Sequence, residues 1–316
     1  MDHKEQFISY LRDIRRYSPR TVAIYEDALK RYEEHKGSLS AEVFTISDIR
    51  EYEAFMMESL KPRTVHQQLS ALSSYCRFLV QEGVLKDNPV KRVRRPKKEK
   101  RLPEFYKKES MDAYFKASEH AEGEDELALL LSAGPGSKLG VELYERRLRR
   151  LIISILGTTG IRRAELISLE KKHFSRERLT LTVHGKGDKM REIPILPSLC
   201  QEICLYLDAA KAMGVESERL LATVKGRPLY PVYVDRAVKT ELGDGFGITG
   251  KVSPHVLRHT LATELLEEGA DLNAIKQMLG HSSLAATQVY THNTVARLKK
   301  VYDTAHPRAQ KSNKDD

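Results

Sequence analysis

The chain contains few cysteines and no long hydrophobic run. Its 316 residues include three cysteines, Cys76, Cys200 and Cys204, and no CxxC pair. Cys200 and Cys204 have i, i+4 spacing on a predicted helix, so we interpret them as reduced packing residues rather than metal ligands or redox groups. No segment is long and apolar enough to span a bilayer. The start, MDHKEQFISYLRD, lacks the apolar core and cleavage site of a signal peptide, so we expect a cytoplasmic location without membrane association.

Signatures of bound nucleotides and metals are also missing. The sequence has no GxxxxGKS or GxxxxGKT loop, and GPGSK at residues 134–138 lacks the required spacing. His255 and His259 have the i, i+4 spacing of a zinc-binding helix. However, no Glu follows His255 and no third ligand lies in register. We therefore expect no metal and no other cofactor.

Positive charge is the main excess in the composition. Lys and Arg number 53 and Asp and Glu number 44, which leaves a formal net charge of +9. Such an excess favours an acidic partner such as nucleic acid. The segment KRVRRPKKEKR, residues 91–101, holds eight basic side chains and one acidic one, and Pro96 interrupts any helix there. We interpret it as a linker that is either a solvated connector or a DNA contact through Arg94, Arg95, Lys97 and Lys98.

The length of the chain predicts two domains. Two predicted helices near the start begin with the same tetrapeptide, Pro-Arg-Thr-Val, at residues 19–22 and 62–65. Ser18 is suited to cap the first helix, and each proline suits a first helical position. The second helix ends at Gly83. Apolar side chains recur at helical spacing along both, as Val22, Tyr25, Leu29 and Tyr32 and as Val65, Leu69, Leu72, Cys76 and Leu79.

Most of the chain beyond the linker is also predicted to be helical. Three helices are predicted first, and the second of them ends at Gly157. Later helices end at Gly269 and Gly280. The acidic and glycine-rich stretch 119–140 interrupts this pattern. We interpret that stretch as a surface excursion or as a regulatory contact with a partner. The three helices are expected over residues 109–120, 144–157 and 162–170.

A predicted β-hairpin carries the first of several notable polar residues. The segments RLTLTV and REIPIL, residues 178–183 and 191–196, flank the turn HGKGDKM. Lys186 lies at its glycine-bounded tip, where the backbone can approach a ligand closely and the ammonium group can move.

Upstream of the hairpin, Arg162 stands at a turn-to-helix junction with Glu165 one turn later. The carboxylate is therefore expected to orient the guanidinium group.

Two further segments carry polar side chains. In SPHVLRH, residues 253–259, a capping Ser253 and a proline at the first helical position place His255 and Arg258 on one face. A polar helix start explains this pattern as well. In LGHSSLAATQVYTH, residues 279–292, Tyr290 alone is equally compatible with a core aromatic. Together, the polar residues form a set suited to phosphoryl transfer, comprising Arg162, Glu165, Lys186, His255, Arg258, His281 and Tyr290.

Four motifs together resemble the tyrosine recombinase family, and most closely its Xer branch of recombinases that resolve chromosome dimers. They are TGIRRAEL, GKGDK, SPHVLRHTLATELLEEG and LGHSSLAATQVYTH. The resemblance covers most of the chain and implies a mainly α fold of the DNA breaking-rejoining type. A helical, SAM-like core-binding domain would precede an α+β catalytic domain with a small antiparallel sheet. Arg163 and Ala164 depart from the family, which often has an apolar residue and Ser or Gly there.

This resemblance assigns the predicted domains. The core-binding domain is expected over residues 1–90, the basic linker over 91–105, the catalytic domain over 106–305 and a tail over 306–316. Base readout in the first domain depends on which helical side chains enter the major groove. The candidates, each of which could equally face solvent or phosphate, are Arg20, Arg63, His66, Gln67 and Arg77.

The resemblance also implies how phosphate would be held. Arg162 and Arg258 would bind the two charged non-bridging oxygens of a DNA phosphate, because a guanidinium group presents paired donors in a plane. His281 would add a hydrogen bond. Glu165 would organise Arg162 or His255.

Bond cleavage would fall to three other side chains. Tyr290 would be the nucleophile and form a 3′-phosphotyrosine intermediate. Because a phenol has a pKa of about 10, it requires a proton acceptor, for which His255 is the candidate. Lys186 would protonate the departing 5′ oxygen. The adduct keeps the phosphoester bond, so rejoining would need neither ATP nor a metal.

The expected function is therefore site-specific recombination of double-stranded DNA by a homo- or hetero-tetramer on two sites, with Xer-type chromosome dimer resolution as the role. The ending HPRA, residues 306–309, resembles Xer tails, which makes a second Xer recombinase and a septal DNA translocase candidate partners. Three alternatives stay open. They are an integrase of a mobile element, a DNA-binding module without catalysis, and a type IB topoisomerase.

Overall fold

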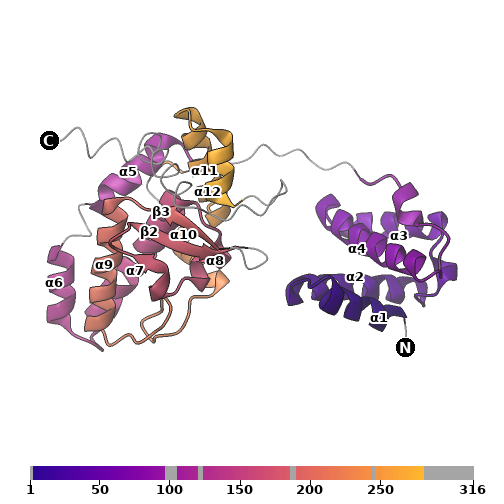
Figure 1. Ribbon diagram of the computed structural model, residues 1–316, viewed down its shortest axis with the longest axis horizontal. Coiled ribbons are helices and arrows are strands. Elements are labelled where there is room, and N and C mark those ends of the chain that lie inside the picture. Colours follow the sequence, from indigo (N-terminus) through magenta and orange to yellow (C-terminus); the bar gives the residue numbers. More distant parts are fainter. Residues whose placement is uncertain are drawn as a thin grey trace. The chain divides into compact units, whose positions relative to one another are not determined.

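The computed structural model divides the chain into two compact units, Met1–Arg101 and Leu102–Asp316 (Figure 1). The residues described are 3–96, 105–119, 124–185, 190–243, 246–248 and 250–280. Both units are built mainly from helices. Within the described residues, no helix is long and apolar enough to cross a membrane.

The first unit is a helical domain with an aromatic core. Both helices that begin with Pro-Arg-Thr-Val are confirmed. Ser18 Oγ accepts a hydrogen bond from the Thr21 backbone at 3.2 Å, so the predicted cap is also present. The helices of this unit are α1 (His3–Ser9), α2 (Pro19–Lys36), α3 (Ile46–Ser59) and α4 (Pro62–Gln81), with a π-helix at Tyr10–Ile14 and short 3₁₀ turns at Ala41–Val43 and Pro89–Arg92.

Helix α4 is the centre of this unit, and the predicted apolar stripe along it is buried from Val65 to Leu79. The ring of Phe7 on α1 lies 5.2 Å from that of Tyr75 and 5.5 Å from that of Phe78, both on α4. Burial raises the pKa of Cys76 to about 12, in agreement with its interpretation as a packing residue. Aromatic contacts thus hold α1 against α4. The apolar pattern of α1 was too short to predict a helix there.

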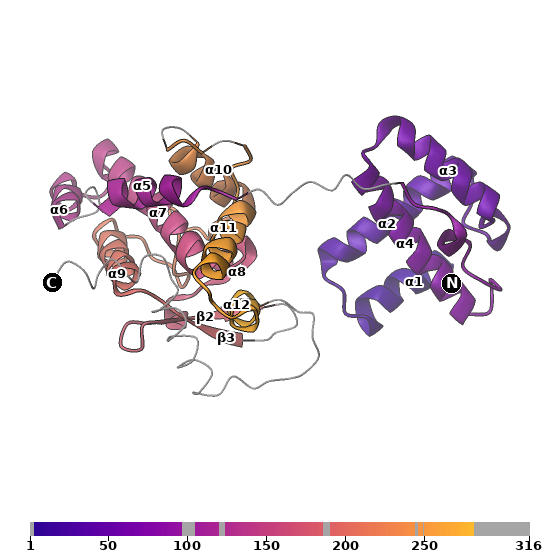
Figure 2. The ribbon, with the colours of Figure 1, turned by 90° about the horizontal axis from the view of Figure 1, so that it is seen from above.

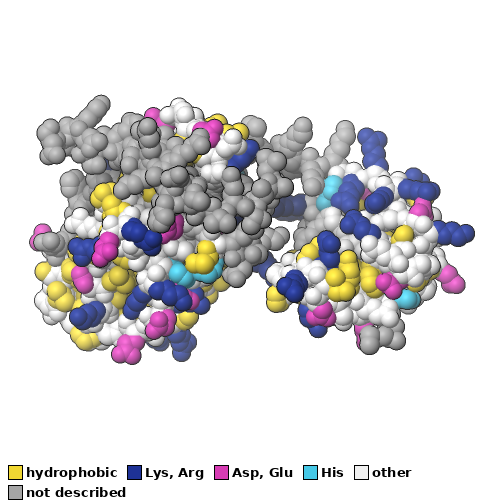
Figure 3. All heavy atoms as spheres, viewed as in Figure 1, with side chains coloured by type: hydrophobic (Ala, Val, Ile, Leu, Met, Phe, Trp, Pro, Cys, Tyr) yellow, Lys and Arg dark blue, Asp and Glu magenta, His cyan; other side chains and the backbone are white. Residues whose placement is uncertain are grey.

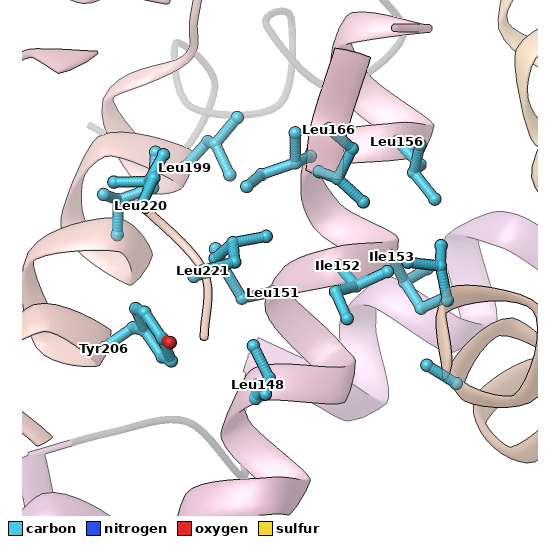
Figure 4. Close-up of a cluster of buried hydrophobic side chains, with 14 of the residues drawn as sticks. Leu148, Leu151, Ile152, Ile153, Leu156, Leu166, Leu199, Tyr206, Leu220 and Leu221 are labelled. Atoms are coloured by element: carbon cyan, nitrogen blue, oxygen red, sulfur yellow. The ribbon is translucent and has the colours of Figure 1, made fainter. Parts of the chain in front are cut away.

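The second unit packs helices around the long helix α7 and places a small sheet at one side (Figure 2). Figure 4 shows the core, where Leu148 and Leu151 of α7 lie on the side toward Tyr206 of α9, and Ile152 lies beside Ile153. The helices are α5 (Lys108–Glu119), α6 (Glu124–Ala133), α7 (Lys138–Thr159), α8 (Arg163–Ser168), α9 (Pro197–Ala212), α10 (Pro231–Leu242), α11 (Pro254–Glu267) and α12 (Leu272–Leu279).

The predicted end of α7 at Gly157 was wrong. The helix continues to Thr159 and ends at Gly160, which has a left-handed φ of 61°. Gly157 serves packing instead, because a Cβ there would lie 3.3 Å from Phe115 Cζ. The following helix, α8, is also shorter than the predicted span 162–170. The turn at Gly160 therefore sets where α8 begins.

Residues 124–133 of the stretch 119–140 are part of the packed fold, although one side of them is exposed. They form α6, which packs on α7 and α9. The side chain of Glu126 is 7% exposed, and its carboxylate lies 2.6 Å from Arg146, 3.2 Å from Arg147 and 3.8 Å from Arg150. An acidic run looks solvated in the sequence, and only the fold brings three arginines of α7 to this carboxylate.

We expect Glu126→Ala to lower the free energy of unfolding by about 3 kcal/mol, since removing one partner of a buried ion pair leaves buried charge uncompensated. Glu142→Ala, at an exposed position of α7, is the control and should change it by less than about 0.5 kcal/mol. Urea denaturation with hydrogen exchange of the α7 amides measures both. Equal effects of the two substitutions would contradict a buried role for Glu126.

The predicted hairpin is confirmed as β2 (Thr180–His184) and β3 (Met190–Pro194), and β1 (Phe174–Ser175) extends it to a three-stranded antiparallel sheet. Strand β1 was missed because two residues carry no periodic signal. In the register, Val183 lies opposite Arg191. Apolar residues occupy the inward positions Leu181, Val183 and Ile193, so Arg191 is a charged residue on the buried face. Helix α12 lies beside β3 in both Figure 1 and Figure 2.

Candidate active site

Arg162 and Glu165 meet at the start of α8. The left-handed turn at Gly160 directs the chain out of α7, and Arg162 occupies the position just before α8. Glu165 Oε2 accepts a hydrogen bond from the Arg162 backbone at 2.7 Å, and Oε1 accepts one from Arg162 Nη1 at 2.9 Å. The spacing of three residues therefore does place the carboxylate on the guanidinium group.

Arg258 approaches the same place from α11. Its side chain is buried, Nη1 donates to the Gly160 carbonyl at 2.6 Å, and Nη2 donates to the Leu279 carbonyl at 2.5 Å. Burial first, and then the charge of Arg162, lower the pKa of Arg258 to about 10. The group is still protonated at pH 7. Two permanently charged guanidinium groups thus lie near one turn of the chain.

His255 lies at the surface of α11, one turn before Arg258. Partial burial lowers its pKa, and the positive charge of Arg163 lowers it further. Arg163 is held in an ion pair with Asp235 of α10. The imidazole is therefore neutral at pH 7, as a proton acceptor must be.

The predicted capping role of Ser253 was wrong. Ser253 stands at the N-cap position of α11, but its side chain makes no capping hydrogen bond. Its buried Oγ has no hydrogen-bond partner within the part of the chain that the structure describes. The backbone of Ser253 instead donates to Tyr106 Oη at 3.1 Å. Pro254 alone therefore supplies the local start signal for α11.

Arg191 is the site residue that sequence reasoning missed. It is 5% exposed, and it donates two parallel hydrogen bonds to Glu165, from Nη1 to Oε1 and from Nη2 to Oε2, each 2.9 Å long. Burial raises the pKa of Glu165, but the hydrogen bonds from Arg191 and Arg162 outweigh burial and hold this pKa below its ordinary value. The signal available in the sequence was an arginine at an inward position of REIPIL.

Three arginines converge on the end of α12. Arg191 Nε donates to the Met278 carbonyl at 3.0 Å, Arg258 to the Leu279 carbonyl, and Arg162 Nη2 to the Gly280 carbonyl at 2.7 Å. The final carbonyls of a helix lack partners within the helix and carry partial negative charge, so cations stabilise them. Among these side chains, one carboxylate faces three guanidinium groups. The cluster keeps an excess of positive charge that favours an anionic ligand.

Gly160 offers a test of how tightly this region is packed. Its Cβ in Gly160→Ala would lie 2.6 Å from Leu279 Cδ2, whereas the control Gly214 has a similar φ of 66° and no atom within 4 Å. We expect Gly214→Ala to lower the free energy of unfolding by about 1 kcal/mol and Gly160→Ala by about 3 kcal/mol, because only the second adds overpacking to backbone strain. Chemical denaturation distinguishes them. Equal losses would mean that Leu279 moves aside without cost.

One group of predicted residues lies outside the described residues, namely Lys97, Lys98, Lys186, His281 and Tyr290.

The other group consists of the candidate DNA contacts among residues 3–96. Figure 3 shows that the Lys and Arg side chains of these residues are spread over the visible face. Arg95 donates to Ser70 Oγ of α4 at 2.9 Å, and His66 Nε2 lies 2.7 Å from the Pro96 carbonyl, so the linker begins along α4. The exposed candidates for DNA contacts are Arg20, Arg63, Gln67, Arg77, Arg94 and Arg95.

The described residues contain no group of three or more His, Cys, Asp or Glu side chains that could hold a metal ion. His255 and His259 therefore gain no third ligand there. The cysteines are free, with Cys76 and Cys200 buried. The chemistry that these residues support is recognition of an anion by arginine and proton transfer by histidine.

Comparisons with known proteins point in the same direction. The model described as "Phage integrase family" matches residues 142–297, and "Phage integrase, N-terminal SAM-like domain" matches residues 5–83. Tyrosine recombinase XerC of Chlorobaculum parvum is 34% identical, covering 96% of this chain and 94% of its own length. Tyrosine recombinase XerC of Bacillus pumilus is also 34% identical, with 96% of each chain covered.

Solved structures share the fold. The Tn1549 transposon integrase in complex with transposon right end DNA has a TM-score of 0.67 at 18% identity, covering 99% of this chain and 98% of the other. XerH bound to a palindromic difH substrate, in a post-cleavage complex, also has a TM-score of 0.67 at 20% identity, with 98% and 84% covered. The mainly α architecture with a small antiparallel sheet agrees with the expected fold class.

Proposed function

The chain belongs to the phage integrase family of site-specific DNA recombinases, and from this membership we propose that it cleaves and rejoins DNA through a 3′-phosphotyrosine on Tyr290. The observation that carries the proposal is the meeting of Arg162 and Arg258 at the end of α12. In the sequence, Gly280 is followed directly by the segment that contains His281 and Tyr290. The end of α12 that the arginines hold is therefore continuous along the chain with the nucleophile segment.

Arg162 and Arg258 would hold the scissile phosphate. The Arg162 side chain is 36% exposed, so a DNA phosphate can reach it from solvent. The guanidinium group of Arg258 is mostly buried, and in this proposal its charge and a further N–H donor hold the second non-bridging oxygen. In the transition state the non-bridging oxygens gain negative charge. Donors fixed in advance stabilise that charge without reorganising. A hydrogen bond from His281 would add to them.

The covalent step balances in atoms and charge. Tyr290 Oη attacks phosphorus and loses its proton to the neutral imidazole of His255, whose lowered pKa suits this role. The bond from phosphorus to the 5′ oxygen breaks, and Lys186 supplies the proton that the leaving oxygen takes. A 5′ hydroxyl of the partner strand then attacks the phosphotyrosine and reverses these transfers. One phosphoester bond is kept throughout, so rejoining consumes no nucleotide.

The biological role we favour is Xer-type chromosome dimer resolution in the cytoplasm, by a homo- or hetero-tetramer on two DNA sites. The curated relatives that support it are named XerC. A lambda integrase tetramer bound to a Holliday junction shares the fold at a TM-score of 0.62 and supports the tetramer. A second Xer recombinase and a septal DNA translocase are the proposed partners. Integration of a mobile element is the second candidate, favoured by the fold shared with the Tn1549 integrase.

Covalent trapping tests the proposal. The protein is mixed with duplexes selected for binding from its own genome, each nicked once near its centre so that cleavage releases a short fragment and religation fails. We expect a denaturant-resistant adduct at Tyr290 that forms in EDTA. If bound duplexes yield no adduct, even after the translocase is added, the protein is a DNA-binding module. Relaxation of plasmids without a selected site would instead indicate a topoisomerase.

A further inference from the structure

Arg191 lies between the segments that the proposed chemistry uses. It is the second residue of β3 and follows Lys186 by five positions in the sequence. Its side chain points into the unit, opposite Val183 of β2, and is 5% exposed. Burying a charged side chain is costly unless it is paired and hydrogen-bonded. The partners that Arg191 meets therefore explain its position.

Within the described residues, Arg191 donates three hydrogen bonds, and all of them are to residues of the candidate active site. Two nitrogens bind the two oxygens of Glu165, and Nε binds the Met278 carbonyl. These contacts use the planar fork and the Nε–H group together. A lysine, with one ammonium group on a flexible stem, cannot reproduce that geometry.

Through Glu165, Arg191 acts on Arg162. The Glu165 carboxylate accepts two hydrogen bonds from Arg191 and two from Arg162. Without Arg191, the carboxylate would lose half of these bonds and be free to rotate. The guanidinium of Arg162 rests on Glu165 Oε1, so it would lose its fixed position as well.

Through Met278, Arg191 acts on the end of α12. The carbonyls of three successive residues, Met278 to Gly280, are held by Arg191, Arg258 and Arg162 in turn. Packing reinforces this contact, since a Cβ at Gly280 would lie 3.0 Å from Arg191 Nη1. The residue that follows Gly280 is His281, and Tyr290 lies nine positions further. Arg191 therefore anchors the point from which the nucleophile segment departs.

We infer that Arg191 is a positioning residue for strand cleavage, which ties the base of the Lys186 hairpin, the Glu165–Arg162 pair and the end of α12 into one unit. This inference rests on the proposed function. Arg191 touches no DNA in this role. Its loss should slow the covalent step within the protein–DNA complex and leave DNA affinity unchanged.

The first test compares Arg191→Lys with Arg219→Lys. Arg219 is a matched control, because it also bridges a carboxylate, of Glu170, and a backbone carbonyl, of Ser168, in the same unit. The rate constant of adduct formation is measured in a single turnover with excess protein on the selected nicked duplex. We expect Arg191→Lys to lower it about tenfold and Arg219→Lys to leave it unchanged, since small misplacements of reacting groups are costly.

A second test uses the charge of Glu165. Three arginines face this carboxylate, namely Arg162 from the start of α8, Arg191 from β3 and Arg258 from α11. The hydrogen bonds of Arg191 are the foremost influence that lowers the pKa of Glu165. In Arg191→Met this pKa should rise, so the cleavage rate should fall more steeply than in wild type as the pH decreases. The double variant Arg191→Met with Glu165→Gln lacks the titrating group and should lose the extra steepness.

The outcomes separate positioning from mere stability. If Arg191 serves only stability, Arg191→Lys lowers the fraction of folded protein but leaves the rate constant of adduct formation in the saturated complex unchanged. That result would overturn the inference. If Arg191→Met fails to fold, the comparison of Arg191→Lys with Arg219→Lys still decides. A wild-type protein that forms no adduct at Tyr290 overturns the proposed function together with this inference. Adducts that form equally fast in wild type and Arg191→Lys overturn the inference alone.

Discussion

Replacing Tyr290 with phenylalanine is expected to abolish the covalent protein–DNA adduct and leave DNA binding intact. Phenylalanine lacks the oxygen that bonds to phosphorus and otherwise keeps the ring. Removing a nucleophile outright typically costs about 10⁴-fold or more in rate, because the remaining groups stabilise a transition state that can no longer form. The adduct is measured on the selected nicked duplex, and binding by gel shift on the same duplex without the nick.

Tyr302→Phe is the matched control for this prediction. Tyr302 lies twelve residues after Tyr290 in the same C-terminal segment, so both substitutions remove one phenol from a neighbouring stretch of chain. Tyr302→Phe should form the adduct at the wild-type rate. An adduct that persists in Tyr290→Phe and disappears in Tyr302→Phe would move the nucleophile to Tyr302. Loss in both variants, with binding intact, would point to a damaged C-terminal segment instead of a missing nucleophile.

Substitution of Arg258 should give the second largest effect. The buried guanidinium holds the carbonyls of Gly160 and Leu279, and it carries a full positive charge beside Arg162. In Arg258→Lys, one ammonium group cannot hold two carbonyls and a phosphate oxygen at once. We expect the single-turnover rate of adduct formation to fall by about 10² to 10³-fold, the range for removing one preorganised donor from a charged transition state.

A suitable control for Arg258→Lys is Arg149→Lys. Arg149 of α7 pairs with Glu241 of α10 at 3.0 Å, so it also joins two helices of the second unit. Its replacement should leave the cleavage rate at the wild-type level. Adduct formation at the wild-type rate in Arg258→Lys would remove Arg258 from the catalytic set. Equal losses in both variants would show that the unit tolerates no change of a helix-bridging arginine.

Local sequence signals predicted several elements correctly. A proline at the first helical position and an apolar stripe were sufficient for α2 and α4, since both signals act within one helix. Alternation predicted the β2–β3 hairpin for the same reason. The pairing of Arg162 with Glu165 also follows from a spacing of three residues. In each of these cases the interacting groups are neighbours along the chain.

Signals of a single residue were less dependable. Gly157 looked like a helix end, yet it allows Phe115 to pack closely, and the end comes at Gly160. Ser253 stands at an N-cap position without making the cap. In both cases the residue type fits two local roles. The neighbours that choose between the roles come from other elements.

The sequence by itself determined the family and predicted the chemistry, because the residue types of the four motifs are written along the chain. Tertiary structure decided how they are held. Arg162 reaches a carbonyl 118 positions away, Arg258 one 98 positions away, and Arg191 a carboxylate 26 positions away. Such contacts depend on how α7, α11, α12 and the sheet pack, and periodicity reports only the face that a residue occupies. From the sequence, Arg191 is therefore an ordinary strand residue, and only the fold shows that Glu165 lies beside it.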